Sequence, residues 1–184
     1  MSHKLLQNMR SERGFSLLEL LLVVGVGALL LLAGIGTYRL VTEGNNINNA
    51  TQLLATLKQQ TQRAFRGQAT YGNAGDDLVP ILVDLRAVPA DVVTGPDGSE
   101  ELVHPFGGSI TITVGSSAGA GQSFVVTFED VNQATCIQMG ALYSQDNDSD
   151  FIEFTAGGSA VTDTDLVTLQ AACTDDADIS WEFY

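Results

Sequence analysis

Basic residues are scarce in this chain of 184 residues, which holds eight Lys and Arg side chains against 22 Asp and Glu. The formal net charge is −14 at pH 7, and no lysine or arginine follows Arg86. A broad phosphate-neutralising surface is therefore excluded, and we expect no nucleic-acid partner. The length suits one domain of ordinary size plus an additional segment.

Groups that carry out catalysis are also few. The chain has two histidines, His3 and His104, and two cysteines, and it contains neither a CxxC pair nor a phosphate-binding glycine loop. A catalytic triad or a zinc site needs more such groups. We therefore predict no enzyme activity, no catalytic residue, no cofactor and no metal site, and we interpret His104 as a structural residue of a turn.

An acidic run at residues 146–150, with the sequence DNDSD, places oxygen ligands at alternate positions, as calcium-binding loops do. An EF-hand loop continues with a glycine and ends in a bidentate glutamate at its twelfth position. This chain has Phe151 and Gly157 at those two places. We therefore favour a solvated acidic turn over a calcium site.

Charge is almost absent from residues 15–36, where Glu19 is the single charged side chain. A helix of this length reaches about 33 Å, enough to cross a hydrocarbon core of about 30 Å. Lys4, Arg10 and Arg13 precede it, and positive charge favours a cytoplasmic location for that end. We predict a membrane-inserted helix that leaves the rest of the chain on the outer side.

The start of this run reads Gly-Phe-Ser-Leu-Leu-Glu at residues 14–19. With basic residues before it and an apolar helix after it, the motif resembles the class III signal of type IV prepilins and pseudopilins. The resemblance implies that a prepilin peptidase cuts between Gly14 and Phe15 and N-methylates Phe15. Glycine suits a scissile bond because its backbone can lie close to a protease.

Glu19 is unusual because a carboxylate within an apolar run costs up to about 3 kcal/mol at the centre of a bilayer, and less near its edge. It follows Phe15 by about one helical turn. The resemblance implies that Glu19 pairs with the new amine of Phe15 in a neighbouring subunit and sets the register of assembly. Glycines at positions 25, 27, 34 and 36 either let this helix loosen on assembly or allow close helix packing.

Beyond the apolar run the pattern becomes amphipathic and predicts a helix over residues 39–67, with a candidate kink at 43–46. One stripe recurs at spacings close to three and four residues and should pack on the sheet of the same chain: Ile47, Ala50, Leu54, Leu57, Ala64 and Phe65. We expect Lys58, Arg63 and Arg66 to be exposed charges of this helix.

Residues 70–109 hold all four prolines and should form loops with short elements, because proline interrupts helices and sheet ladders. Their run HPFGG at 104–108, ahead of a strand, resembles the same region of type IVb pilins. Residues 110–114 and 124–128 are β-rich and predict a hairpin with a flexible tip.

The C-terminal part predicts one helix and two further strands. Asp130 is expected to cap a helix over residues 131–143, with Gln133 completing a capping box. Strands are expected at residues 151–154 and 179–184. In the second of these strands alternate apolar residues share one face, so it should lie within the sheet rather than form a loose tail.

Cys136 and Cys173 both lie in the part predicted to be exported. An even number of cysteines in an oxidising compartment favours one disulfide, and the resemblance agrees because pilins commonly link their C-terminal segment in this way. A closed loop of about 38 residues would stabilise the fold by about 4 kcal/mol in the chain-entropy model. Two reduced, buried thiols are the alternative.

We therefore predict an α+β pilin-like fold, with a long N-terminal α-helix whose hydrophobic half protrudes and a C-terminal antiparallel β-sheet. The predicted divisions are a leader peptide at 1–14, a transmembrane or filament-core helix at 15–38, an amphipathic helix at 39–67 and a head at 68–184. The predicted disulfide encloses the region 136–173.

The resemblance implies a structural subunit, a major pilin of a type IVb pilus, that polymerises with other pilin subunits. Its further partners would be prepilin peptidase and the assembly platform with its ATPase. The chain would lie in the inner membrane with a periplasmic C-terminus before it joins an extracellular filament. We expect its basic residues at 58–86 to dock on acids of neighbouring heads.

Two other functions are compatible with these features. A minor pilin or a pseudopilin of type II secretion shares every N-terminal feature. A membrane-anchored binding domain that never polymerises is the second alternative, since hydropathy alone does not separate it from a pilin.

Overall fold

The computed structural model describes residues 16–142, 148–163 and 165–184, with the side chains of residues 34–40 excepted. The chain divides into two compact units, an N-terminal unit, Met1–Glu43, and a head, Gly44–Tyr184. Gly14 and Phe15, the predicted cleavage and methylation residues, lie outside the described residues.

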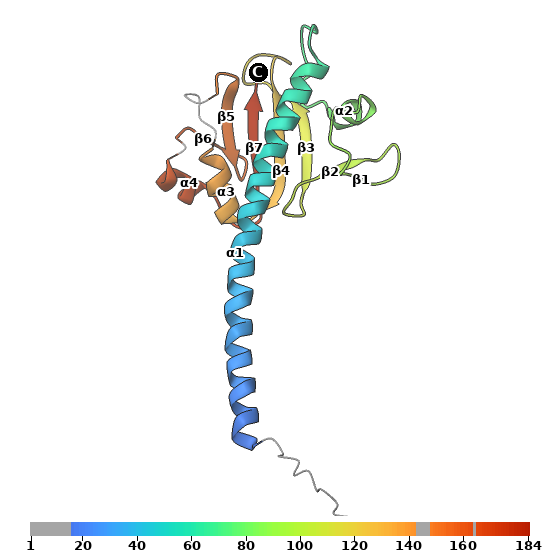
Figure 1. The fold of residues 1–184 in the computed structure, drawn as a ribbon. Coiled ribbons are helices and arrows are strands. Elements are labelled where there is room, and N and C mark those ends of the chain that lie inside the picture. Colours follow the sequence, from blue (N-terminus) through green and yellow to red (C-terminus); the bar gives the residue numbers. More distant parts are fainter. Residues whose placement is uncertain (1–15, 143–147, 164) are drawn as a thin grey trace, which may run out of the picture. The chain divides into compact units, whose positions relative to one another are not determined.

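Helix α1, Leu17–Ala64, contributes to both units and is the longest element (Figure 1). Within the head its apolar stripe is buried as predicted: Ile47, Ala50, Leu54 and Leu57 are at most 9% exposed, while Ala64 and Phe65 are half-buried against the core. The helix is not interrupted at residues 43–46, the candidate kink, although the division between the two units falls there.

The head is built on a seven-stranded sheet whose strands pair antiparallel in the order β1-β2-β3-β4-β7-β5-β6. The strands are β1 Val93–Thr94, β2 Glu101–Val103, β3 Ser109–Val114, β4 Phe124–Val131, β5 Phe151–Ala156, β6 Ser159–Val161 and β7 Ala177–Phe183. The last strand lies between β4 and β5, so the C-terminal segment belongs to the interior of the sheet, as the alternation of apolar residues predicts (Figure 1).

The core lies between the sheet and the head portion of α1. Trp181 of β7 pairs with Val126 of β4 on one side and Phe154 of β5 on the other. Its ring meets Phe128 edge-on at 5.4 Å between centroids, and Leu54 and Leu57 of α1 belong to the same buried cluster. Aromatic contacts of this kind add to the stabilisation that comes from burying apolar area.

The described residues of the head also form the short helices α2 Val79–Asp84, α3 Gln133–Gly140 and α4 Leu166–Ala172. The predicted cap of α3 is wrong. Asn132 is its N-cap and accepts a hydrogen bond from the Thr135 amide at 2.9 Å, whereas Asp130 still belongs to β4 and has a φ of 56° beside a register shift. The strand therefore extends further than propensity indicates, and the helix begins after it and ends earlier than predicted.

The loop between β3 and β4, predicted to be a flexible tip, is held at its first residues by hydrogen bonds to β7. The buried Glu182 carboxylate of β7 accepts hydrogen bonds from the Ser116 amide at 3.1 Å and the Ser117 amide at 2.9 Å. The hydroxyls of Ser117 and Ser123 donate to it at 2.6 and 2.5 Å. A Cβ at Gly115 would collide with this carboxylate, so a larger residue there would have to displace the Glu182 side chain. These four bonds satisfy an anion that burial would otherwise destabilise.

Candidate assembly surface and disulfide-bounded region

In the described part of the N-terminal unit, α1 exposes a row of large apolar side chains. Twelve leucines and valines in its first half are each at least 49% exposed: Leu17, Leu18, Leu20, Leu21, Leu22, Val23, Val24, Val26, Leu29, Leu30, Leu31 and Leu32. Among the described residues, a Cβ added at Gly25 or Gly27 would meet no atom within 4 Å, so no contact among them requires glycine at either position.

Glu19 lies in the first turn of α1 and is exposed among these apolar side chains. An acid in the first turn complements the partial positive charge of a helix N-terminus. The carboxylate therefore stands at the helix end nearest the predicted cleavage site.

Among the parts of the chain that the structure describes, no helix combines the length and the hydropathy needed to cross a membrane.

A disulfide joins Cys136 of α3 to Cys173 at the C-cap of α4, with the two Cα atoms 5.8 Å apart. Both residues are at most 1% exposed, and the bond links residues 37 positions apart, so that it encloses β5, β6 and α4. The Gln133 side chain donates to the Cys173 carbonyl at 2.9 Å beside it. The disulfide thus holds α3 and the end of α4 to one another.

Lys58 is buried and not one of the exposed charges, which corrects the prediction for this residue. Its ammonium lies 2.6 Å from Asp148 and 3.4 Å from Asp150, and 5.1 Å from the centre of the Phe183 ring. Nearby, Gln62 donates to the Asp150 carboxylate and to the Tyr184 carbonyl. The sequence held one signal for this, because Lys58 lies four residues after Leu54 and therefore beside the buried stripe.

The interaction with Lys58 stabilises the ionised form of Asp148. Burial by itself would raise the pKa of this carboxyl. The hydrogen bonds from Lys58 and from the Asp150 amide, with the positive charge of Lys58, outweigh burial and lower the pKa below its ordinary value. The acidic run is thus attached to α1 by an ion pair that links residues 90 positions apart.

Two family models match the chain. The model described as the PilS N terminal matches residues 44–182, which is more than half of the chain, and the prokaryotic N-terminal methylation motif matches residues 9–35. The chain belongs to the PilS family of type IV pilins. No curated protein sequence matches it. The PilS family consists of structural pilins and is not an enzyme family. Membership in it associates this chain with the pilus.

Solved structures agree with this pilin fold. The type IV b pilin from Salmonella typhi has a TM-score of 0.57 and 18% identity, over 75% of this chain and 97% of that one. TcpA, a type IV pilin from Vibrio cholerae El Tor biotype, has a TM-score of 0.57 and 16% identity, over 76% and 99%. The predicted α+β fold and the predicted likeness to type IVb pilins are both confirmed.

The acidic run of this pilin differs from the favoured solvated turn. Asp146 and Asn147 lie outside the described residues. Asp148 and Asp150 form ion pairs with Lys58 and are therefore not simply solvated. Within the described ranges, no three His, Cys, Asp or Glu side chains are grouped so that they could hold a metal ion.

His104 is a buried residue of the turn that leads into β3. Its Nε2 lies 2.8 Å from the Glu129 carbonyl, and the Phe106 amide donates to its Nδ1 at 3.3 Å. The ring stacks on Phe128 with centroids 5.1 Å apart. Burial lowers the pKa of His104, and the Glu129 carbonyl and nearby acids oppose this only in part. The neutral imidazole therefore links the turn to β4, which is the kind of structural role that the sequence predicts for His104.

Proposed function

We propose that this chain is the precursor of a major subunit of a type IVb pilus. Prepilin peptidase cuts between Gly14 and Phe15 and methylates Phe15. Before assembly the apolar helix lies in the inner membrane, with the head on the periplasmic side. The platform and ATPase of the pilus machinery then add the subunit to other copies in an extracellular filament. The exposed apolar half of α1 is the observation that carries this proposal.

The physical argument concerns where that apolar surface goes. Twelve large side chains that are each at least 49% exposed would cost about 1 kcal/mol or more each in water, so the helix needs an apolar environment. Lipid supplies it to the single subunit, and neighbouring helices supply it in a filament. The bare glycines at positions 25 and 27 suit close helix contact because no side chain separates the backbones.

Glu19 supplies the register of this assembly. Cleavage creates a positive α-amino group at Phe15, and an unpaired charge at the edge of an apolar medium is costly. In a staggered bundle of parallel helices, Glu19 of one subunit meets the amine of its neighbour. Both charges are then compensated, which favours the docked register over others.

The mass of the mature N-terminus tests the processing step. We expect the purified subunit to begin at N-methylphenylalanine derived from Phe15. A chain that still begins at Met1, or one that begins downstream of residue 38, would disprove it, because both outcomes leave no processed helix to form a filament core.

A substitution at Glu19 tests polymerisation. We expect Glu19→Ala to reduce filaments at least tenfold in sheared surface fractions while processing continues. The matched control is Glu43→Ala, at the other end of the same N-terminal unit, which should leave filament yield within twofold. If Glu19→Ala has no effect, the chain acts as an anchored domain that does not polymerise.

The same fractions separate a major from a minor subunit. A major pilin should account for most of the protein mass in sheared filaments. A minor pilin or a pseudopilin would be present at trace level beside a different, dominant subunit, and that result would contradict the major role while leaving the family unchanged.

A further inference from the structure

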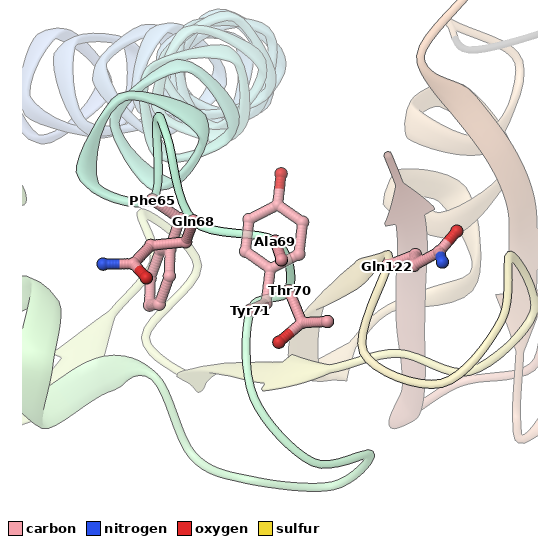
Figure 2. Close-up of a pocket in the computed structure, with 6 residues that line it drawn as sticks. All are labelled: Phe65, Gln68, Ala69, Thr70, Tyr71 and Gln122. Atoms are coloured by element: carbon pink, nitrogen blue, oxygen red, sulfur yellow. The ribbon is translucent and has the colours of Figure 1, made fainter.

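A hollow of about 230 Å³ lies on the head, where the end of α1 meets the β3–β4 loop. Six residues line it: Phe65, Gln68, Ala69, Thr70, Tyr71 and Gln122. Figure 2 shows Gln68 and Phe65 on one side and Gln122 on the other, with Thr70 and Tyr71 between them. The hollow thus joins two segments that are about fifty residues apart in the sequence.

The walls of the hollow are fixed by contacts that do not involve a ligand. The Tyr71 amide donates to the Gly121 carbonyl at 2.8 Å and so fastens the segment after α1 to the β3–β4 loop. The Tyr71 ring packs between Phe65 and Phe124, with centroids 5.2 and 5.1 Å away. Gly121 has a φ of +71°, and a Cβ there would collide with the Gly72 carbonyl. The cavity is therefore formed before any ligand arrives.

Among the described residues that line the hollow none is charged, although the head has many acids. Gln68 and Gln122 are exposed and each offers both a donor and an acceptor, and the Thr70 hydroxyl does the same. Burial raises the pKa of the Tyr71 phenol and the charge of Asp150 raises it further, so this group stays neutral at physiological pH. Among the described residues such a lining offers no positive counter-charge to an anionic ligand.

We propose that this hollow binds a neutral sugar residue. A pyranose ring has alternating hydroxyls, which suit amide and hydroxyl partners, and a C–H face, which packs on an aromatic ring. The volume is below the 300–1,000 Å³ that is usual for drug-sized ligands, and it therefore suits a single ring.

A ligand of this size binds weakly. Because the free energy available to a small ligand is limited per atom, we expect a dissociation constant on the order of millimolar. Polymerisation would repeat the site along a filament and raise avidity without new contacts. Only this last consequence depends on the proposed function; binding by the single subunit does not.

Ligand-observed saturation-transfer NMR on the full chain tests the proposal. The protein is held in lauryldimethylamine oxide, a detergent without a sugar head group. The probes are methyl β-D-glucopyranoside and methyl β-D-galactopyranoside, and methyl β-D-glucuronide is a control of similar size that carries a carboxylate. We expect transfer to at least one neutral glycoside, with half-saturation on the order of millimolar, and binding of the glucuronide at least fivefold weaker.

Gln122→Leu removes one amide from the hollow, and Gln170→Leu makes the same change at an exposed position of α4. We expect the first to weaken binding of the neutral glycoside at least fivefold and the second to leave it unchanged. Both positions are exposed, so neither change should affect folding. No transfer at about 50 mM glycoside, equal binding of the glucuronide, or equal binding by the Gln122 variant would each overturn the proposal.

Discussion

The two halves of α1 are both rich in leucine, yet their side chains have opposite environments. In the N-terminal unit Leu29 to Leu32 are each 68–70% exposed, whereas Leu53, Leu54 and Leu57 in the head are at most 7% exposed. The difference lies in the pattern. In the first half apolar residues surround the helix, while in the second half they form one stripe.

This contrast separates the apolar surface that is buried within the head from the apolar surface that needs an environment outside the chain. A stripe can be buried by one sheet, as it is in the head, but a helix that is apolar on all sides needs lipid or several neighbouring helices. Changes in the head should therefore alter its stability, and changes in the first half should alter assembly.

The largest effect on the head should come from its covalent link. Replacing Cys136 and Cys173 together by alanine should lower the free energy of unfolding by about 4 kcal/mol, because the loop is no longer restricted in the unfolded state. Urea denaturation followed by the fluorescence of Trp181, the one tryptophan in the sequence, measures this. Wild type treated with a reductant should show the same loss, and a loss below about 1 kcal/mol would contradict the prediction.

A pair of leucines compares the two halves directly. Leu54→Ala should destabilise the head by about 3 kcal/mol, since Leu54 is fully buried and its removal leaves a cavity. Leu30→Ala, in the exposed half, should change unfolding by less than about 0.5 kcal/mol but reduce filament yield. The comparison fails if both changes destabilise the head equally.

Lys58→Met should cost the head about 2 kcal/mol, because it leaves Asp148 and Asp150 without their counter-charge while the apolar stem is kept. Arg63→Met on the exposed side of the same helix is the control and should cost less than about 0.5 kcal/mol. Equal losses in the two variants would show that the ion pair contributes nothing specific.

The Lys58 ion pair also predicts a pH dependence. The pKa of Asp148 is lowered in the folded state, so its stabilisation is complete above the ordinary value of 3.8 and is lost as the pH falls through the lower folded value. Lys58→Met should lose this part of the acid sensitivity. Denaturation midpoints between about pH 5 and 2 would reveal it, and parallel curves for the two proteins would refute it.

The smallest effect on the head is expected for exposed arginines. Arg63→Glu and Arg66→Glu should change its unfolding free energy by less than about 1 kcal/mol, because neither side chain forms an ion pair among the described residues. If these arginines dock on acids of neighbouring heads, both charge reversals should weaken filaments. Arg63→Gln should weaken them less than Arg63→Glu, because it removes the positive charge without adding a negative one. Unchanged filament yield would contradict this role for the two arginines.

Local pattern predicted much of the head. The spacing of Ile47 to Leu57 predicted the buried stripe, and alternation at Ile179, Trp181 and Phe183 predicted a strand within the sheet. Propensity did not separate Asp130 from Asn132 as the cap of α3, because both residue types suit that position. The choice depends on where β4 stops pairing with β7, and that pairing joins residues about fifty positions apart.

The sequence by itself determined the two kinds of helical surface, the motif at residues 14–19 and the excess of acid, since each of these is a property of neighbouring residues. Tertiary structure alone decided that Lys58 compensates Asp148, that Ser116, Ser117 and Ser123 bind the Glu182 carboxylate, and that Phe65 and Gln122 line one hollow. These partners lie about 60 to 90 residues apart, and their meeting depends on the order of strands in the sheet, which periodicity does not encode.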